Sequence, residues 1–137
     1  MPRLVLDTSW VAASVFEDEA SAEADAPYVR VVQDGIVVPA IWPLEVANMI
    51  RQGERRGRIA TSNLDATLAR LLAIPCQVEP VTSAQALTAI LNLARLHGLT
   101  SYDASYLSLA MGSDMPLATR DGALIRTARA EGVALVT

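Results

Sequence analysis

The sequence predicts one α/β domain, in which a central, mostly parallel sheet of about five strands lies between two layers of helices. Short apolar, β-branched runs alternate along the whole chain with longer segments of helical period. No repeat, linker or low-complexity tract interrupts this alternation. The chain has 137 residues, of which 52% are hydrophobic, so one domain spanning 1–137 with a sizeable core is expected.

The first half of the chain predicts two buried strands and three helices. In chain order these are a strand at Leu4–Leu6, helices over about 9–17 and 20–34, a strand at Ile36–Val38 and a helix over roughly 41–57. Asp34 and Gly35 are typical of the end of a helix. Pro43 is compatible with a helix only in its first turn, which fixes where the last of these elements begins.

The second half predicts four helices and three strands. In chain order these are a helix from Ser62 to Pro75, a strand at 77–79, a helix from Thr82 to Gly98, a helix over about 101–111, a strand at 116–119, a helix over 121–131 and a strand at 133–136. Ser62-x-x-Asp65 and Thr82-x-x-Gln85 resemble capping boxes. The helix that begins at Ser62 should bury one face, formed by Leu64, Leu68, Leu71 and Leu72.

The composition excludes several kinds of active site. All 11 basic residues are arginine, so the lysine of a P-loop, a Schiff-base enzyme or a response-regulator receiver is missing. One cysteine, Cys76, and one histidine, His97, exclude a disulfide framework, a Cys/His zinc site and a Cys–His dyad. A Ser–His–Asp triad stays possible, and His97 is its one candidate histidine.

Charge and hydropathy indicate where the protein acts. The N-terminal apolar run ends at Asp7, too early for a signal peptide, and the apolar stretch 36–44 contains two prolines and is too short for a bilayer. A cytoplasmic protein without membrane contact is therefore expected. The formal net charge of −4 argues against a protein that coats nucleic acid with a basic face.

Four carboxylates are expected at one edge of the sheet. Asp7 directly follows the first strand, and Asp121 follows the strand that ends at Thr119. Asp103 lies in the first turn of its helix, and Glu45 lies one or two turns into the helix after the second strand. Because ligands of such sheets bind beyond the carboxyl ends of the strands, these acids can converge on one cleft.

Each aspartate also has a simpler explanation. Asp7 and Asp121 stand where helix N-caps are expected, and Asp103 completes a capping box with Thr100. Glu45 differs because it interrupts an apolar run, and a buried, unpaired carboxylate costs several kcal/mol or binds a proton. Clustered carboxylates are stable only with protons or cations between them, and hard oxygen ligands select Mg²⁺ or Mn²⁺.

Four short motifs resemble those of PIN-domain nucleases, and more narrowly of the VapC-type toxins of toxin–antitoxin pairs. They are Val5-Leu6-Asp7-Thr8-Ser9, Pro43-Leu44-Glu45-Val46, Ser101-Tyr102-Asp103-Ala104 and Ala118-Thr119-Arg120-Asp121. The resemblance spans essentially the whole chain and maps the family's catalytic, metal-binding acids onto Asp7, Glu45, Asp103 and Asp121. Ser9 and Thr119 fall on the supporting hydroxyl positions.

The resemblance implies an endoribonuclease that depends on Mg²⁺ or Mn²⁺. It also implies inhibition by a cognate antitoxin, whose C-terminal segment lies across the groove of the toxin. Two other functions stay open: an inert PIN-like binding module that acts through partner assembly, and a haloacid-dehalogenase-type phosphatase. The phosphatase would need an acid where this chain has Ser9 and a lysine that it lacks.

Arginines near these acids are candidates for contact with RNA. Arg51 and Arg55 belong to a cluster with Arg56 and Arg58 near the end of the helix that carries Glu45, and Arg120 adjoins Asp121. We single out Arg51, Arg55 and Arg120 as possible RNA contacts. The alternative for the cluster is favourable placement of cations at a helix C-terminus.

Large apolar residues outside the strands have two interpretations. Four of them form either ordinary core or an apolar surface for a partner or a second copy of the chain: Trp10, Val11, Phe16 and Trp42. A homodimer is expected. The identity of the RNA and of the antitoxin does not follow from the sequence.

Overall fold

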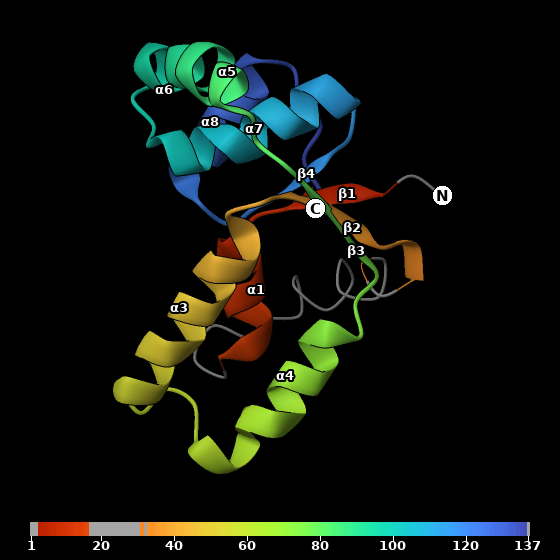
Figure 1. The fold of residues 1–137 in the computed structure, drawn as a ribbon, viewed down its shortest axis with the longest axis vertical. Coiled ribbons are helices and arrows are strands. Elements are labelled where there is room, and N and C mark those ends of the chain that lie inside the picture. Colours follow the sequence, from red (N-terminus) through yellow and green to blue (C-terminus); the bar gives the residue numbers. More distant parts are fainter. Residues whose placement is uncertain (1–2, 17–30, 32, 137) are drawn as a thin grey trace.

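The computed structural model describes residues 3–16, 31 and 33–136, and places a parallel sheet between two layers of helices, as predicted (Figure 1). The strands are β1 (Leu4–Leu6), β2 (Ile36–Pro39), β3 (Cys76–Glu79) and β4 (Leu117–Ala118). The helices are α1 (Thr8–Val15), α3 (Trp42–Arg55), α4 (Leu64–Leu72), α5 (Ser83–Gln85), α6 (Leu91–His97), α7 (Ser101–Ser113) and α8 (Gly122–Ala130). In Figure 1, α1, α3 and α4 lie on one side of the sheet and α5 to α8 on the other.

The sheet has the strand order β3-β2-β1-β4, and every pairing is parallel. β1 is central: Val5 aligns with Val37 of β2 on one side and with Leu117 of β4 on the other. Helices cover both faces, so a central strand of such a sheet is apolar throughout. All three residues of β1 are fully buried, which explains the unbroken Leu-Val-Leu run.

The prediction of about five strands is wrong by one strand within the described residues. The predicted last strand, 133–136, forms only an isolated parallel bridge between Leu135 and Leu117. β4 has only two residues, and Leu117 alone exchanges hydrogen bonds with this segment, through Ala134 O at 2.8 Å and Val136 N at 3.0 Å. A ladder cannot extend along so short a strand.

The predicted helices are mostly present. The helix predicted over 20–34 lies largely outside the described residues; its described part, 31 and 33–34, is helical and ends at Gly35, which has φ +83°. The Thr82–Gln85 capping box is present and opens α5. A π-helical turn, Ala86–Ile90, joins α5 to α6. Within the described ranges, every helix is too short or too polar to cross a lipid bilayer.

Helix α4 differs from its prediction in two ways. Residues 61–63 form a 3₁₀ turn, so the helix begins at Leu64 and Ser62 is not in position to cap it. The expected leucine face is incomplete: Leu72 is 85% exposed, whereas Thr67 is buried. One residue step turns a helix by about 100°, so Leu71 and Leu72 cannot both face the sheet.

The four large apolar residues of uncertain role belong to the interior: Trp10, Val11, Phe16 and Trp42 are between 1% and 7% exposed. Their burial supports the interpretation that they form ordinary core. Phe16 directly follows α1, and its ring packs against Gly53 of α3. A Cβ atom on Gly53 would come within 2.4 Å of the Phe16 ring, so only glycine permits this contact.

The end of α3 is a Schellman motif. Gly57 takes a left-handed conformation with φ +72°, and its N–H donates to Glu54 O at 3.2 Å. The N–H of Arg58 donates to Gly53 O at 2.8 Å. The turn therefore brings Arg58 back over the glycine on which Phe16 lies, with its guanidinium 4.2 Å from the centroid of the Phe16 ring.

Gly53→Ala should lower the free energy of unfolding by about 1–3 kcal/mol, because the added methyl group overpacks the contact with Phe16. The matched control is Gly112→Ala in α7, where nothing lies within 4 Å of the added Cβ. That variant should raise the free energy of unfolding by about 0.5–1 kcal/mol, since alanine is the better helix former. Urea denaturation measures both, and equal effects of the two substitutions would contradict the Phe16 contact.

Candidate active site

The candidate site lies where the strand order reverses. The chain passes from β1 outward through β2 to β3 and then returns to β4 on the other side of β1. The carboxyl ends of β1 and β4 therefore flank a topological switch point, the usual position of a ligand site in such sheets. Asp7 follows β1 directly, and Thr119 follows β4 directly.

The Asp7 carboxylate is the centre of a hydroxyl network. Ser9 Oγ donates to Asp7 Oδ2 at 2.5 Å, and Thr119 Oγ1 donates to the same oxygen at 2.8 Å. The two hydroxyls lie 3.2 Å apart, but both of their protons point to Asp7. This bonding leaves each hydroxyl oxygen free to accept, and the N–H groups of Arg120 and Asp121 fill those positions.

Asp7 is not a simple helix cap. It occupies the N-cap position of α1, but its side chain makes no capping hydrogen bond. Asp7 is 4% exposed, and this burial raises the pKa of its carboxyl, against the opposing effect of the Ser9 and Thr119 hydroxyls. A charge buried in this way favours either a proton or a cation beside it.

Asp121 and Asp103 both lie at the start of a helix, and both are also candidate site residues. Asp121 caps α8, because its Oδ2 accepts from the N–H of Leu124 at 2.9 Å. Thr100 caps α7 by accepting from the N–H of Asp103 at 3.1 Å. The simpler explanation is therefore correct for Asp121, which is both a cap and a neighbour of the Asp7 network.

Glu45 is held by two side chains that sequence reasoning missed. Tyr106 donates to Glu45 Oε1 at 2.5 Å, and Thr8 donates to the same oxygen at 3.4 Å. Tyr106 is fully buried, and burial together with its hydrogen bond to Glu45 raises the pKa of its phenol far above the usual range. Tyr106 therefore stays a donor. The sequence did contain a signal for this contact: Tyr106 follows Asp103 by one helical turn, so both side chains lie on the same face of α7.

The pKa of Asp103 shows that all four acids share one electrostatic environment. It is raised from 3.8 to about 6, first by burial and then by the charges of Asp7, Asp121 and Glu45. The Thr100 hydroxyl acts in the opposite direction. Asp7, Glu45 and Asp121 are thus close enough to Asp103 to raise its pKa, although the four acids come from four separate segments.

The donor chemistry at this edge fits a hard divalent cation. All four side chains offer carboxylate oxygens, the ligands that such a cation prefers. The pKa of Asp103 is raised first by burial and then by the charges of the other three acids, and a bound cation would lower it. Among the described residues, however, no three His, Cys, Asp or Glu side chains are already arranged as a metal-binding group. The carboxylates would have to move closer together, which their repulsion opposes until a cation is present.

A hollow of about 270 Å³ runs along α3 from Glu45, and we call it the α3 hollow; Asp7, Asp103 and Asp121 are not part of its lining. Its lining includes Thr8, Glu45, Gln52, Gly53, Arg56 and Arg58. Arg51 lies outside it, with an exposed side chain that pairs with Glu54 at 3.2 Å. Arg55 is exposed in the last turn of α3, as expected of a cation at a helix C-terminus.

Of the arginines singled out from the sequence, only Arg120 adjoins the acids. Its N–H donates to Ser9 Oγ at 3.0 Å, and the residue is exposed. Arg56 and Arg58, the other members of the α3 cluster, are the ones that line the α3 hollow.

Comparisons with known proteins identify the family and the fold. A family model of the PIN domain matches residues 4–130. Curated proteins gave no match. The fold is similar to that of PAE2754 from Pyrobaculum aerophilum, with a TM-score of 0.66 and 23% identity over 92% of this chain and 79% of that chain. It is also similar to FitAcB from Neisseria gonorrhoeae, with a TM-score of 0.59 and 17% identity over 98% of this chain and 96% of that chain.

At 23% and 17% identity, the similarity to these two solved structures supports the fold alone. The family model carries more weight, because it runs from the first residue of β1 to the last residue of α8 and includes all four acids. The chain therefore belongs to the PIN domain family.

Proposed function

We propose that this protein is an endoribonuclease of the toxin class that depends on Mg²⁺ or Mn²⁺ and hydrolyses phosphodiester bonds of cytoplasmic RNA. PIN domains are generally nucleases, which supports hydrolysis of nucleic acid. The observation that carries the proposal is the buried Asp7 carboxylate at the switch point of the sheet, which the hydroxyls of Ser9 and Thr119 hold in place. Burial disfavours the charged form of this carboxylate, and a divalent cation bound at this edge would favour it.

In this proposal Asp7, Glu45, Asp103 and Asp121 hold the divalent ion. Bound there, the ion would polarise the phosphodiester and lower the pKa of the attacking water. Ser9 and Thr119 orient Asp7 through its Oδ2, so the carboxylate cannot rotate freely. Tyr106 and Thr8 do the same for Glu45. These hydroxyls fix the direction of each carboxylate without neutralising its charge.

Asp103 is the acid of this group whose pKa is raised to about 6. It is partly buried, as are Glu45 and Asp121, so it can exchange a proton with solvent near neutral pH when no cation is bound. The partners proposed are the RNA substrate and a cognate antitoxin, the latter on the resemblance to VapC-type toxins. A homodimer stays a prediction.

The competing function is an inert PIN-like module that acts through assembly with a partner. It would share the fold and the acids but would show neither metal-dependent stabilisation nor cleavage after release from any partner. The three predictions below separate these two functions.

Asp7→Asn should abolish RNA cleavage and growth inhibition, because it removes the charge at the centre of the hydroxyl network. Thermal stability should stay equal or rise, since burial raises the pKa of this carboxyl and so opposes its charged form. Asp65→Asn is the matched control: Asp65 is an exposed acid on α4 and should be replaceable without effect. An unchanged cleavage rate in Asp7→Asn, or full wild-type activity in excess EDTA, would refute the proposal.

Asp103→Asn should stabilise the metal-free protein at pH 7 by about 1 kcal/mol, a value reduced for the solvent screening of a partly exposed group. The pKa of Asp103 is about 6 in the folded state against 3.8 ordinarily, so the folded protein binds this proton more tightly. Wild-type stability therefore falls as the pH rises from about 4 to 6, and the advantage of Asp103→Asn grows over the same window.

Urea denaturation at several pH values in EDTA measures this advantage. Saturating Mg²⁺ should then stabilise the wild type more than the variant. A stability difference that is independent of pH would show that the charge of Asp103 is not the cause.

Tyr106→Phe should raise the Mg²⁺ concentration needed for half-maximal cleavage by about 10-fold or more. Glu45 loses the hydrogen bond from the Tyr106 hydroxyl, while the phenyl ring stays in the core. The free energy of unfolding should fall by only about 1 kcal/mol. Tyr102→Phe on the same helix is the control, because Tyr102 is 58% exposed. This substitution should leave the Mg²⁺ requirement unchanged. Equal Mg²⁺ requirements in the two variants would contradict the positioning role of Tyr106.

A further inference from the structure

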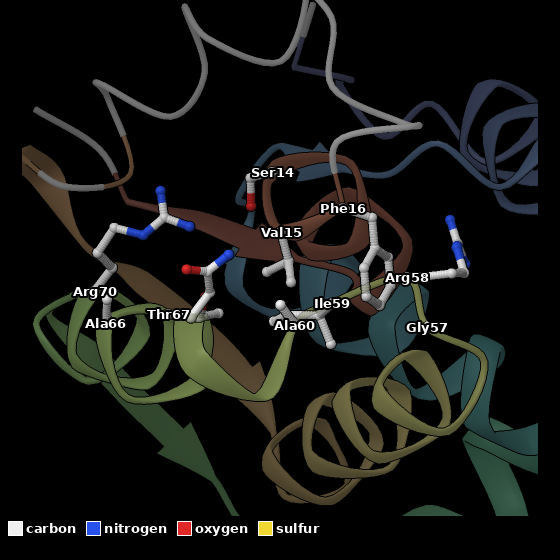
Figure 2. A pocket seen from close by; sticks show the side chains of 11 residues that line it. Ser14, Val15, Phe16, Gly57, Arg58, Ile59, Ala60, Ala66, Thr67 and Arg70 are labelled. Atoms are coloured by element: carbon white, nitrogen blue, oxygen red, sulfur yellow. The ribbon is translucent and has the colours of Figure 1, made fainter.

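A second hollow lies between the end of α1, the turn after α3 and one face of α4, and we call it the α4 hollow. It has a volume of about 640 Å³, and the four candidate acids are not part of its lining. Figure 2 shows Thr67 and Arg70 of α4 toward one end of the hollow, and Arg58 with Phe16 at the other end. Among the described residues that line it, the ionisable side chains are these two arginines. The lining therefore favours an anion over a cation.

The face of α4 that lines this hollow carries three polar side chains in a row. Asn63, Thr67 and Arg70 follow one another at spacings of four and three residues. Side chains at these spacings are neighbours on one face of a helix, with Cβ atoms about 5–6 Å apart. Ala66, between the first two, is too small to separate them. One small ligand in the hollow can therefore contact all three polar side chains.

These three side chains make no hydrogen bond or ion pair within the part of the chain that the structure describes. Asn63 occupies the N-cap position of α4, but its side chain makes no capping hydrogen bond. Arg70 is exposed in the last turn of α4, and no described carboxylate pairs with it. Their hydrogen-bond donors are therefore available to a ligand.

The Thr67 hydroxyl indicates most clearly that the hollow takes a polar ligand. Thr67 is only 5% exposed, and a buried hydroxyl normally has a hydrogen-bond partner. Thr127 of α8, which is also 5% exposed, shows the usual arrangement: its hydroxyl donates to Ala123 O, four residues earlier, at 2.7 Å. Thr67 makes no such bond to the carbonyl of its own helix. Its hydroxyl is left at the wall of the hollow that it lines.

We propose that the α4 hollow is a phosphate-binding site in which Arg70, Thr67 and Asn63 hold one phosphate group. A guanidinium binds two phosphate oxygens through parallel N–H bonds, and the hydroxyl and the side-chain amide supply donors for the other oxygens. A carboxylate has only two oxygens, which the guanidinium alone would occupy. Three donor side chains in a row therefore favour phosphate over carboxylate.

The site is independent of the proposed nuclease function, because none of the four acids lines the hollow. Arg58 is not one of the proposed ligands, since its guanidinium lies over the Phe16 ring at the other end. Free phosphate and a phosphate of a nucleic acid offer the same chemistry to the three side chains, and the experiment separates these two sources.

The experiment is an NMR titration of the amide groups of the full chain with inorganic phosphate, in EDTA and at constant ionic strength. The amides of α4 should shift on binding. Arg70→Gln and Thr67→Val should each weaken phosphate binding about tenfold, because each removes a hydrogen bond to a charged ligand. Arg129→Gln is the matched control: Arg129 is an exposed arginine in the last turn of α8, outside the hollow, and its loss should change affinity less than twofold.

Thermal unfolding without phosphate tests the Thr67 hydroxyl separately. Thr67→Val should leave the Tm equal or raise it, because the lost hydroxyl has no partner. Thr127→Val should lower the Tm, because it removes the hydrogen bond to Ala123 O. A loss of Tm in Thr67→Val as large as that in Thr127→Val would show that the Thr67 hydroxyl already has a structural partner, and the inference would fail.

A second titration, with a short single-stranded RNA that lacks terminal phosphates, separates the two sources. RNA binding that depends on Arg70 assigns the site to a nucleic-acid phosphate, whereas dependence on Arg70 with inorganic phosphate alone assigns it to the free ion. The inference is overturned if neither ligand shifts the α4 amides, or if Arg70→Gln binds both ligands as tightly as Arg129→Gln does. A hollow that takes an acidic peptide instead of phosphate would give that result, and RNA cleavage at the four acids would be unaffected.

Discussion

The hydrogen bonds of Thr119 and Ser9 to one oxygen of Asp7 hold the two ends of the described chain together at the carboxyl edge of the sheet. β1 and β4 are adjacent strands separated by most of the sequence, and their pairing places these hydroxyls on either side of Asp7. The N–H of Asp121 donates to the Thr119 hydroxyl, so the start of α8 is fixed by the same group. The ends of β1 and β4 and the start of α8 are therefore linked through a single buried carboxylate at the candidate site.

Hydroxyl groups hold most of the acids of this edge. Ser9 and Thr119 serve Asp7, Tyr106 and Thr8 serve Glu45, and Thr100 serves Asp103. A hydroxyl orients a carboxylate but leaves its charge in place, whereas an arginine or lysine would neutralise it. The pKa of Asp103 is raised first by burial and then by the charges of Asp7, Asp121 and Glu45, while the Thr100 hydroxyl lowers it. A chain without lysine can concentrate negative charge in this way for a divalent ion to neutralise.

The sequence alone predicted the three layers and most element positions, because short apolar strands alternate with segments of helical period. It also predicted four acids near one edge of the sheet, because the carboxyl ends of parallel strands meet there, and their role in a site stays a prediction. It failed where the outcome depends on packing between distant segments. The last strand is a single bridge because β4 is short. Tyr106 of α7 reaches Glu45 of α3 although these two helices lie on opposite sides of the sheet. Likewise, Arg58 was indistinguishable from its neighbours in the cluster until Gly53 and Phe16 were seen to position it.

The most direct test is a ¹³C NMR titration of the side-chain carboxyls, followed at Asp103 with and without Mg²⁺. The account predicts a midpoint near pH 6 for the metal-free protein, because burial and three neighbouring charges oppose ionisation. Saturating Mg²⁺ should move that midpoint well below its metal-free value, since the ion binds the charged form. A midpoint near 3.8 without metal, or one that Mg²⁺ leaves unchanged, would contradict the claim that these four carboxylates form one cation site.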